Sequence, residues 1–314
     1  MNDGADQVRV AICVATRGRP AGLGSLLDAL ALVREPDNAH IIIVIVDNDP
    51  AGGSRGLVLE RAAGARWPIE YHIEPQPGIP FARNAAVAAC RDRVDAIVFI
   101  DDDELPEPEW LHQLLATRRQ FAADVVTGPV LPRFDVPPPA WVTDGGFFDY
   151  PRFKTGTPRD TAFTNNVIVN ASIFADLKTW FDERLQFTGG SDTHLFRRLH
   201  LAGYRIVWCD AAIVHDCVPP SRMTVPWLMQ RSYRYGHTHA FVRMDLKQST
   251  RLAIAGAALG KLRFAVSSLI RGVIGFRRSR LIDAGRETAY VAGMLAQLFG
   301  ASYGEYATRG TSSS

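Results

Sequence analysis

Three consecutive carboxylates follow an apolar run in the first third of the chain. Residues 96–100 read Ala-Ile-Val-Phe-Ile, and Asp101, Asp102 and Asp103 come directly after them. An apolar run of this length predicts a buried strand, and three carboxylates at its end repel one another and resist desolvation. Mg²⁺ and Mn²⁺ prefer oxygen ligands, often together with substrate phosphates. The triplet therefore predicts either a metal–diphosphate site or a solvated acidic turn.

Three further polar clusters lie where predicted strands end or a predicted helix begins. Their residues are Thr16 with Arg17, Asp47, and Arg83 with Asn84. Arginines suit phosphate groups, and an acidic side chain suits ribose hydroxyls or a base N–H. In open α/β folds ligands bind at the carboxyl ends of the strands, so we expect a nucleoside diphosphate there. The sequence has no G-x-x-x-x-G-K-[ST] loop, and no G-x-G-x-x-G follows the first strand.

The hydrophobic pattern before residue 130 alternates between strand and helix. Strands are predicted at 8–14, 40–46, 69–73, 96–100 and from Val125, and helices at 23–30, 54–63, 81–90 and 110–121. This alternation predicts an α/β fold with a largely parallel sheet and helices on both faces. Residues 131–163, rich in Pro, Gly and aromatic residues, predict a long irregular segment of the kind that usually serves function. Beyond them we expect a strand at 167–169, a helix at 192–202 and a strand at 204–208.

The composition allows one large α/β domain with an appendage. The chain has 314 residues, of which 47% are hydrophobic, and a formal net charge of +2. This is enough apolar material for a sizeable core. The four cysteines show no C-x-x-C spacing, which favours a reducing compartment without disulfides or a zinc site. The short polar N-terminus does not resemble a secretory signal, so we expect a cytoplasmic protein.

The C-terminal part is basic and apolar at once. Residues 243–280 contain nine Lys or Arg against one acid, Asp245. This pattern predicts either an interfacial helix on an anionic membrane surface or a helical tail with a solvated basic face. Charges at Lys261, Arg263 and Arg271 disfavour a spanning helix, and the scarcity of aromatics disfavours nucleic acid. We therefore expect a catalytic domain at 1–242, a helical extension at 243–307 and a disordered tail at 308–314.

The order of these motifs resembles that of family 2 glycosyltransferases with the GT-A fold. The resemblance covers roughly residues 8–240. It rests on Ala15-Thr16-Arg17, Val46-Asp47-Asn48, Gly78 with Ala82-Arg83-Asn84, Phe99-Ile100-Asp101-Asp102-Asp103 as the D-x-D motif, and Gly189-Gly190-Ser191-Asp192. Segments 128–130 and 218–222 and the Pro-rich loop are similar to the succinoglycan-type (ExoM-like) branch of bacterial exopolysaccharide enzymes. Ser191 stands where the family often has Glu, and the Q-x-x-R-W motif of processive synthases is absent, so we expect a non-processive enzyme.

The resemblance implies a metal-dependent, inverting glycosyltransferase that uses Mn²⁺ or Mg²⁺. Asp103, with Asp101, would bind the cation, and His215 would complete the metal shell. Asp192 would act as the base on the acceptor hydroxyl. The implied contacts to the nucleotide-sugar are Thr16, Arg17, Asp47, Arg83, Asn84, Asp101, Asp102, Arg231 and Arg234, and those to the acceptor are Trp141, Gly189 and Gly190.

The resemblance also implies partners and a location. The donor would be a UDP-sugar, with UDP-glucose as the first choice. The acceptor would be a glycan or lipid-linked oligosaccharide, and the enzyme would lie peripherally on the cytoplasmic face of the inner membrane. Two other functions stay open: a sugar-phosphate nucleotidyltransferase, although the loop at 16–20 has only one glycine, and a degenerate domain that only binds glycan or scaffolds an assembly.

Several of these residues also have simpler interpretations. An acid in the first turn of a helix, such as Asp192, is stabilised by the helix dipole alone. Asp102 could turn inward and accept backbone N–H bonds. His215 is equally well explained as a surface histidine, and Trp141 as a core residue. Arg83 could instead pair with a nearby acid, although phosphate binding is favoured because an arginine near a helix N-terminus makes an anion site. Arg231 and Arg234 are equally well explained as part of a solvated helix face.

Overall fold

The computed structural model describes residues 7–301 and residue 304, so the predicted tail at 308–314 lies outside the described part. The chain divides into two compact units, each built from separate stretches of sequence. We call them the sheet unit (1–131, 150–186 and 191–217) and the helical unit (132–149, 187–190 and 218–314). Residue 243, where we expected an extension to begin, lies inside helix α8 (Val225–Asp245).

The sheet unit is built on an eight-stranded sheet with the order β3-β2-β1-β4-β9-β6-β10-β8. The strands are β1 (Val8–Thr16), β2 (Ala39–Asp47), β3 (Ile69–Ile73), β4 (Ala96–Phe99), β6 (Val125–Thr127), β8 (Pro158–Arg159), β9 (Val167–Asn170) and β10 (Ile206–Trp208). Strands β3, β2, β1 and β4 are parallel, as are β6 and β10. β9 runs antiparallel between β4 and β6, and β8 is antiparallel to β10. The predicted parallel α/β sheet is confirmed, with an antiparallel strand in its middle.

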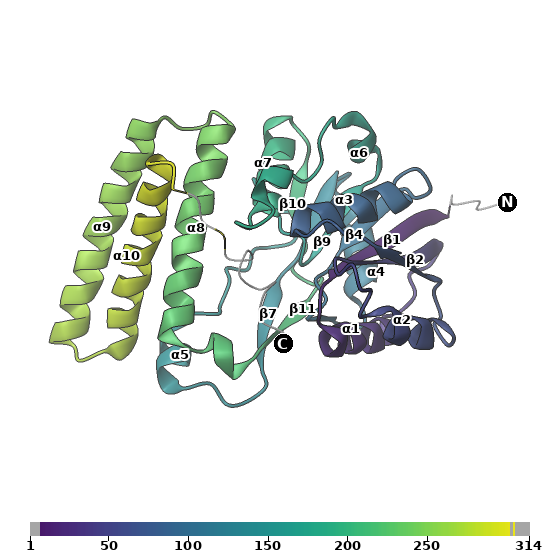
Figure 1. The fold of residues 1–314 in the computed structure, drawn as a ribbon, viewed down its shortest axis with the longest axis horizontal. Helices are drawn as coiled ribbons and strands as arrows, with labels where there is room; N and C mark the ends of the chain where they lie inside the picture. Colours follow the sequence, from purple (N-terminus) through teal and green to yellow (C-terminus); the bar gives the residue numbers. More distant parts are fainter. Residues whose placement is uncertain (1–6, 302–303, 305–314) are drawn as a thin grey trace. The chain divides into compact units, whose positions relative to one another are not determined.

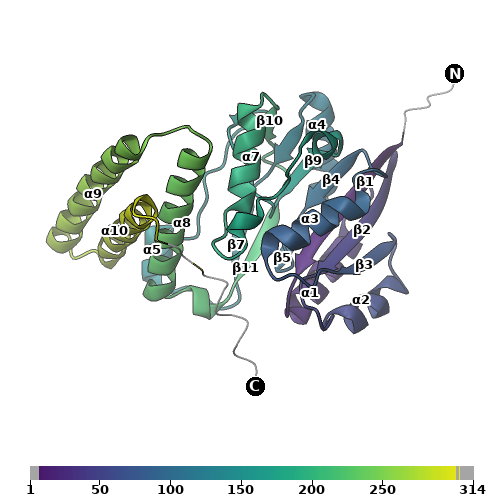
Figure 2. The same cartoon turned by 45° about the horizontal axis from the view of Figure 1, so that its top comes forward.

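Helices cover both faces of this sheet, because its strands are apolar on both sides. The helices are α1 (Pro20–Leu32), α2 (Arg55–Ala62), α3 (Ile79–Cys90), α4 (Trp110–Gln120), α6 (Ser172–Asp176) and α7 (Ser191–Leu201), with the 3₁₀ helix η1 (Glu183–Leu185). One core cluster joins Val10, Ile12 and Val14 of β1 to α1, α2 and α4. The other joins Ala11 and Cys13 to α3, α6 and α7. Figures 1 and 2 show α3 on the face of the sheet opposite to α1 and α2.

A second, three-stranded sheet has the order β5-β11-β7. Its strands are β5 (Glu104–Pro106), β11 (Val214–Val218) and β7 (Val130–Phe134). β5 follows the aspartate triplet immediately and pairs antiparallel with β11. The segment at 131–163, expected to be irregular, contains most of β7, the helix α5 (Ala140–Gly145) and β8.

The helical unit contains three long helices, α8, α9 (Arg251–Ile274) and α10 (Arg278–Leu298). α10 packs against both α8 and α9, and Figure 1 shows it between them. Glycines permit this close packing: a Cβ on Gly236 would lie 1.9 Å from the Tyr290 carbonyl oxygen. A separate apolar cluster, which includes Val142, Phe147 and Leu228, joins α5 to the start of α8.

Candidate functional site

The parallel strands bring the predicted clusters to one edge of the sheet. Thr16, the last residue of β1, is in register with Asp47, the last residue of β2. Cys13 of β1 is in register with Phe99 of β4, so the aspartate triplet follows β4 at the same carboxyl edge. This is the position at which open α/β sheets bind ligands.

Asp47 is completely buried at this edge. Its carboxylate accepts hydrogen bonds from the Tyr71 hydroxyl at 2.7 Å and from the backbone N–H groups of Ser54 at 3.0 Å and Asp49 at 3.1 Å. Burial, together with Asp47, raises the pKa of Tyr71. A carboxylate offers about four acceptor positions. Three of these positions are filled, and contact of Asp47 with the nucleoside of a donor stays a prediction.

The neighbouring Asn48 fixes the loop that precedes α3. Its side-chain amide donates to the carbonyls of Glu74 (3.0 Å) and Gln76 (2.7 Å), and its oxygen accepts from the N–H of Gly78 (2.8 Å). Gly78 has φ 138°, and a Cβ there would lie 2.8 Å from the Cβ of Gln186. A glycine is therefore required at this point. Asn48 and Gly78 together set where α3 begins.

Within the aspartate triplet, Asp102 turns inward. Its carboxylate accepts from the Thr16 hydroxyl at 2.7 Å and from Arg19 Nη1 at 3.2 Å. It was expected to turn inward onto backbone N–H groups or to contact the nucleotide-sugar, and these two side chains are the partners observed. Burial raises the pKa of Asp102 to about 6, although Thr16 and Arg19 favour its ionised form. Asp102 therefore links the triplet to the end of β1.

Asp101 and Asp103 are each held by an arginine. Arg19 Nη1 lies 3.0 Å from Asp103 Oδ2, and Arg83 Nη2 lies 3.2 Å from Asp101 Oδ1. Burial raises the pKa of Asp101, and Arg83 opposes this rise, yet 43% of the Asp101 side chain remains exposed. Asp101 is thus accessible to a ligand while its charge is partly balanced by Arg83.

Glu104, the residue after the triplet, adds a fourth carboxylate to this edge. It is 3% exposed, and among the residues the structure describes its Oε2 has no hydrogen-bond partner. Burial, and then the charges of Asp101 and Asp216, raise the pKa of Glu104 well above its ordinary value. Asp216 lies directly opposite Glu104 in the antiparallel β5–β11 pair, so both side chains point to the same face. A buried oxygen without a partner is costly and suits a cation ligand.

His215 points the other way. It is opposite Leu105 in the same strand pair, and successive side chains of a strand point to opposite faces. Its Nε2 lies 3.0 Å from Glu107 Oε1. The role of His215 as a metal ligand stays a prediction, and the geometry of the strand favours Asp216 for the face occupied by Glu104.

The predicted base lies close to the triplet. Asp192 is in the first turn of α7, and its Oδ1 accepts from the N–H of Thr193 at 2.7 Å. The charge of Asp192 is one of the influences that raise the pKa of Asp101. Arg83 Nη1 lies 3.4 Å from the hydroxyl oxygen of Ser191, at the limit of a hydrogen bond. Arg83 therefore contacts both the triplet and the start of the helix that presents Asp192.

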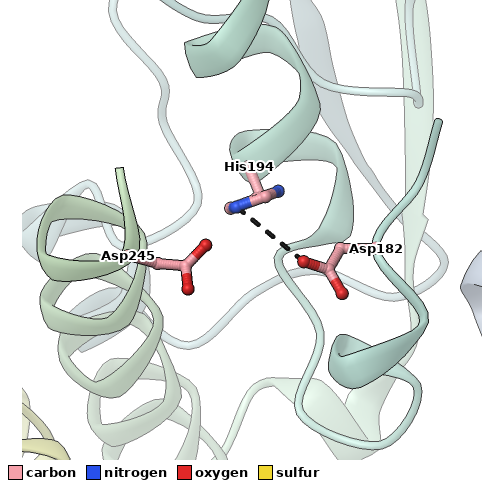
Figure 3. A group of neighbouring side chains, drawn as sticks. All are labelled: Asp182, His194 and Asp245. Atoms are coloured by element: carbon pink, nitrogen blue, oxygen red, sulfur yellow. Dashed lines mark ion pairs between the residues drawn. The ribbon is translucent and has the colours of Figure 1, made fainter. Parts of the chain in front are cut away.

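A buried pair links α7 to the segment that precedes η1. His194 Nε2, on α7, lies 3.9 Å from Asp182 Oδ2, just before η1 (Figure 3). Both residues are buried. Burial works to raise the pKa of Asp182, but the hydrogen bonds from Arg184 and the charge of His194 outweigh it, so the pKa is lowered. Asp245, also drawn in Figure 3, belongs to the helical unit.

Asn84 and Arg17 differ in how they are held. The Asn84 amide donates to the Phe181 carbonyl and accepts from the Phe181 N–H, both at 3.0 Å, so it joins α3 to the loop before η1. Arg17 is exposed in the turn after β1. Contact of either residue with a nucleotide-sugar stays a prediction.

The remaining predicted site residues belong to the helical unit. Arg231 Nε donates to the Tyr235 hydroxyl at 2.8 Å, and the buried Arg234 lies over the Tyr235 ring. Trp141 packs against the apolar cluster of α5 and α8, which agrees with its interpretation as a core residue. Gly189 and Gly190 both have positive φ, and a Cβ on Gly190 would lie 2.2 Å from Thr238 Cγ2. Their contacts with donor or acceptor stay predictions.

Comparison with known proteins decides the family. The sequence profile described as "Glycosyl transferase family 2" matches residues 11–180. The chain is also 32% identical over 262 residues to the succinoglycan biosynthesis protein ExoM of Rhizobium meliloti (strain 1021), covering 81% of this chain and 83% of ExoM. The chain belongs to glycosyl transferase family 2. It is therefore a glycosyltransferase, and the predicted family and ExoM-like branch are confirmed.

Solved structures show that this family 2 enzyme has the GT-A fold. The mannosyltransferase PcManGT from Pyrobaculum calidifontis, in complex with GDP-Man and Mn²⁺, matches with TM-score 0.65 and 15% identity, over 96% of this chain and 90% of that one. TarS residues 1–349 of S. aureus, in complex with UDP, matches with TM-score 0.54 and 15% identity, over 94% of this chain and 93% of that one. At these identities the similarity concerns the fold.

Four contributors to the site of this family 2 enzyme are absent from the predicted site residues. Arg19 bridges Asp102 and Asp103, Glu104 adds the buried carboxylate, Asp216 lies opposite Glu104, and Tyr71 donates to Asp47. Arg19 and Glu104 adjoin predicted motifs in the sequence, so a charged side chain at either position was enough to indicate a site residue. Asp216 becomes visible only through its pairing with Glu104, which no local pattern reveals.

Proposed function

We propose that this enzyme transfers one sugar per encounter from a UDP-sugar to a glycan or lipid-linked oligosaccharide, with inversion and with Mn²⁺ or Mg²⁺ as cofactor. The observation that carries the proposal is the set of acidic side chains at the carboxyl edge of β4, which are held by Arg19 and Arg83 and linked through Arg83 to Ser191, the residue before Asp192. Cation ligands, arginines for phosphate and a general base are the groups that such a transfer needs.

The residues present fit a divalent cation. Asp101 and Asp103 would hold it, with Glu104 behind them, because the donor set consists of carboxylates and one buried Glu104 oxygen lacks a partner in the described structure. Oxygen-only sites of this kind suit Mg²⁺ and Mn²⁺. When bound, such a cation supplies screening for the negative charge that develops on the diphosphate leaving group.

The chain's own residues supply the remaining steps. Asp192 accepts the proton of the acceptor hydroxyl as that oxygen attacks the anomeric carbon. The hydroxyl oxygen forms the new glycosidic bond while the bond from the sugar to the diphosphate breaks, so a single in-line displacement inverts the anomeric carbon. Asp47 binds the nucleoside part of the donor through its remaining acceptor capacity. Arg83 orients Asp101 and contacts the diphosphate, and Arg231 and Arg234 are proposed as further phosphate ligands.

The partners are proposed from relatives. ExoM is named for succinoglycan biosynthesis, and TarS has been solved with UDP and with UDP-GlcNAc. The TarS complexes support a UDP-sugar donor, and the name of ExoM supports a role in exopolysaccharide biosynthesis. UDP-glucose is the first donor to test. We also propose that the enzyme works at the cytoplasmic face of the inner membrane, where a lipid-linked acceptor would be presented.

The test is a measurement of UDP release. The purified protein is incubated with UDP-glucose, UDP-galactose or UDP-GlcNAc, with Mn²⁺ or with EDTA. We expect slow hydrolysis of one donor that needs Mn²⁺ and is lost in Asp103→Ala. Formation of pyrophosphate from UTP and a sugar 1-phosphate would instead support a nucleotidyltransferase. Absence of UDP release with every donor, together with absence of UDP binding, would support a scaffolding domain.

A further inference from the structure

Helix α9 has an inverted distribution of side-chain size. The residues it buries are Ile254, Ala258, Ala265, Ser268 and Gly272, most of them small. Its large apolar residues point outward, and the exposed ones are Leu252, Leu259, Leu262, Phe264, Val266, Leu269, Ile270, Val273 and Ile274. A helix of a water-soluble protein normally turns its large apolar side chains toward the core. The outward face of α9 therefore requires a covering.

The exposure of this face is large and continuous. Leu252 is 83% exposed, Ile274 is 74% exposed, and Phe276 just beyond the helix is 96% exposed. Leu259, Leu262, Val266 and Ile270 recur every three or four residues, so they share one side of the helix. Contiguous exposed apolar surface of this kind marks a binding face.

The buried side of α9 shows how it is held. It packs against α10, and a Cβ on Gly272 would lie 2.7 Å from Leu281 Cδ2. Small residues at a helix–helix contact allow close approach, as they do where large side chains are left to face lipid. α9 is also the described helix that is long and apolar enough to cross a membrane, yet only 22% of its most apolar window is buried.

Charge favours lipid over a second copy of the chain. Residues 243–280 contain nine basic residues and one acid, and Arg263 and Arg271 on α9 are exposed. In a two-fold symmetric dimer built on this face, the same basic side chains would meet each other, and opposed like charges are unfavourable. An anionic bilayer attracts these charges and covers the apolar side chains at the same time.

An ion pair argues that α9 lies along the bilayer rather than across it. Lys261 Nζ, near the middle of α9, lies 2.9 Å from Glu287 Oε2 of α10. If α9 spanned a bilayer with α10 attached, this pair and the nearby Asp283 and Arg286 of α10 would lie near the apolar centre, where charged groups are costly. A helix in the interface keeps α10 in water.

We propose that the outward face of α9 docks on the anionic surface of a lipid bilayer, with the helix in the membrane plane and its large apolar side chains in one leaflet. This deepens the proposed function by naming the surface at which a lipid-linked acceptor would be met. Docking depends only on the helical unit, whereas sugar transfer depends on the site in the sheet unit. An experiment can therefore contradict the docking proposal without contradicting the proposed function.

The experiment is flotation of the full chain with vesicles. The expected result is binding to vesicles of phosphatidylcholine with phosphatidylglycerol, weakened by salt, and little binding to phosphatidylcholine alone. The triple variant Leu259→Gln, Val266→Gln, Ile270→Gln should reduce binding at least about tenfold, because three apolar side chains no longer enter the leaflet. A matched control changes three exposed leucines of the sheet unit, Leu32→Gln, Leu59→Gln and Leu201→Gln, and should bind as the parent does. Equal binding by the two triple variants, or no binding by the parent, would overturn the proposal.

Two further measurements test the alternatives, a second copy of the chain on the outward face of α9 and an α9 that spans the membrane. Sedimentation in vesicle-free buffer is expected to show a monomer, and a dimer that dissociates in the α9 triple variant would identify a second copy of the chain as the covering. In intact cells, a membrane-impermeant thiol reagent should not reach Leu281→Cys on α10, and labelling there would show that α9 spans the membrane.

UDP-sugar hydrolysis in vesicle-free buffer should be unchanged in the α9 triple variant. Loss of vesicle binding with intact hydrolysis then concerns docking alone.

Discussion

Arg83 binds Asp101 of the aspartate triplet, with Arg83 Nη2 3.2 Å from Asp101 Oδ1. The same guanidinium places Nη1 3.4 Å from the hydroxyl of Ser191 and lies over the Phe181 ring. The Arg83 side chain is only 11% exposed, so its geometry is fixed by packing. One side chain of α3 thus connects the proposed cation site to the residue before the proposed base.

Arg83→Lys should therefore lower the rate of sugar transfer, because a lysine ammonium cannot make the two divergent contacts of a guanidinium. We expect a loss of roughly ten- to a hundredfold in kcat from the misplacement of Asp101 and Asp192. The matched control is Arg91→Lys, immediately after the last residue of the same helix, since Arg91 donates to the Phe174 carbonyl and lies over Trp180. Equal kcat values for both variants would show that Arg83 has only a structural role.

Glu104→Gln should weaken Mn²⁺ binding, measured by calorimetry or by electron paramagnetic resonance of free Mn²⁺. The amide keeps the size of the side chain but cannot offer an anionic oxygen to a cation at this buried position. Loss of such an outer ligand typically lowers metal affinity by about ten- to a hundredfold. Glu109→Gln serves as the control, because Glu109 is exposed and pairs with Arg34. A Glu104→Gln variant with unchanged Mn²⁺ affinity would exclude Glu104 from the metal site.

Asp192→Asn should abolish most transfer while leaving donor binding intact. Asparagine keeps the shape of the side chain but cannot accept the proton of the acceptor hydroxyl, so we expect a loss of about 10²- to 10⁴-fold in kcat. UDP affinity, measured separately by calorimetry with Mn²⁺, should stay near that of the parent. A variant that retains the full transfer rate would contradict the assignment of Asp192 as the base.

Asp182→Asn should lower stability in a pH-dependent way. The pKa of Asp182 is lowered in the folded state, so its ionised form is favoured on folding. Its contribution is therefore present above the unfolded pKa of about 3.9 and is lost as the pH falls through the lower folded value. At pH 7 we expect a loss on the order of 1 kcal/mol, since Arg184 is 60% exposed and solvent screens the pair.

Urea unfolding of the parent and of Asp182→Asn at several pH values measures this contribution. The difference in unfolding free energy should be constant near neutral pH and should shrink below pH 4. Asp95→Asn removes the partner of Arg9, which lies near the start of β1. This variant is a control for the general effects of removing a charge. The transfer rate should fall only in the Asp182 variant, because Asp182 positions α7. A difference that grows as the pH falls would contradict the lowered pKa.

Much of the sheet unit was predictable because its signals are local. The predicted strand at 69–73 coincides with β3, and the predicted helix at 110–121 with α4 to within one residue. The order of the motifs also placed Thr16, Asp47 and the aspartate triplet at one edge, since parallel strands end on the same side. In these segments the spacing of the apolar residues and the positions of the turn residues indicate the same strands and helices. The tertiary packing stabilises those same elements.

The remainder depends on contacts between distant parts of the chain. Asp216 and Glu104 are brought together by the β5–β11 pair, and nothing near either residue indicates the other. The three stretches of the helical unit were not separable by composition, because 131–149 was interpreted as part of an irregular loop. The basic and apolar pattern at 243–280 was visible in the sequence, but only the structure shows that the large apolar side chains of α9 point outward.

The most direct test of the cation site is titration calorimetry of UDP into the parent protein and into Asp103→Asn, each with Mn²⁺ and with EDTA. If the carboxylates at the edge of β4 hold a cation that binds the diphosphate, the parent should bind UDP with Mn²⁺ and lose nearly all affinity in EDTA. Asp103→Asn should bind weakly under both conditions. Equal UDP affinity of the parent with and without Mn²⁺, or an Asp103→Asn variant that binds as the parent does, would contradict the account.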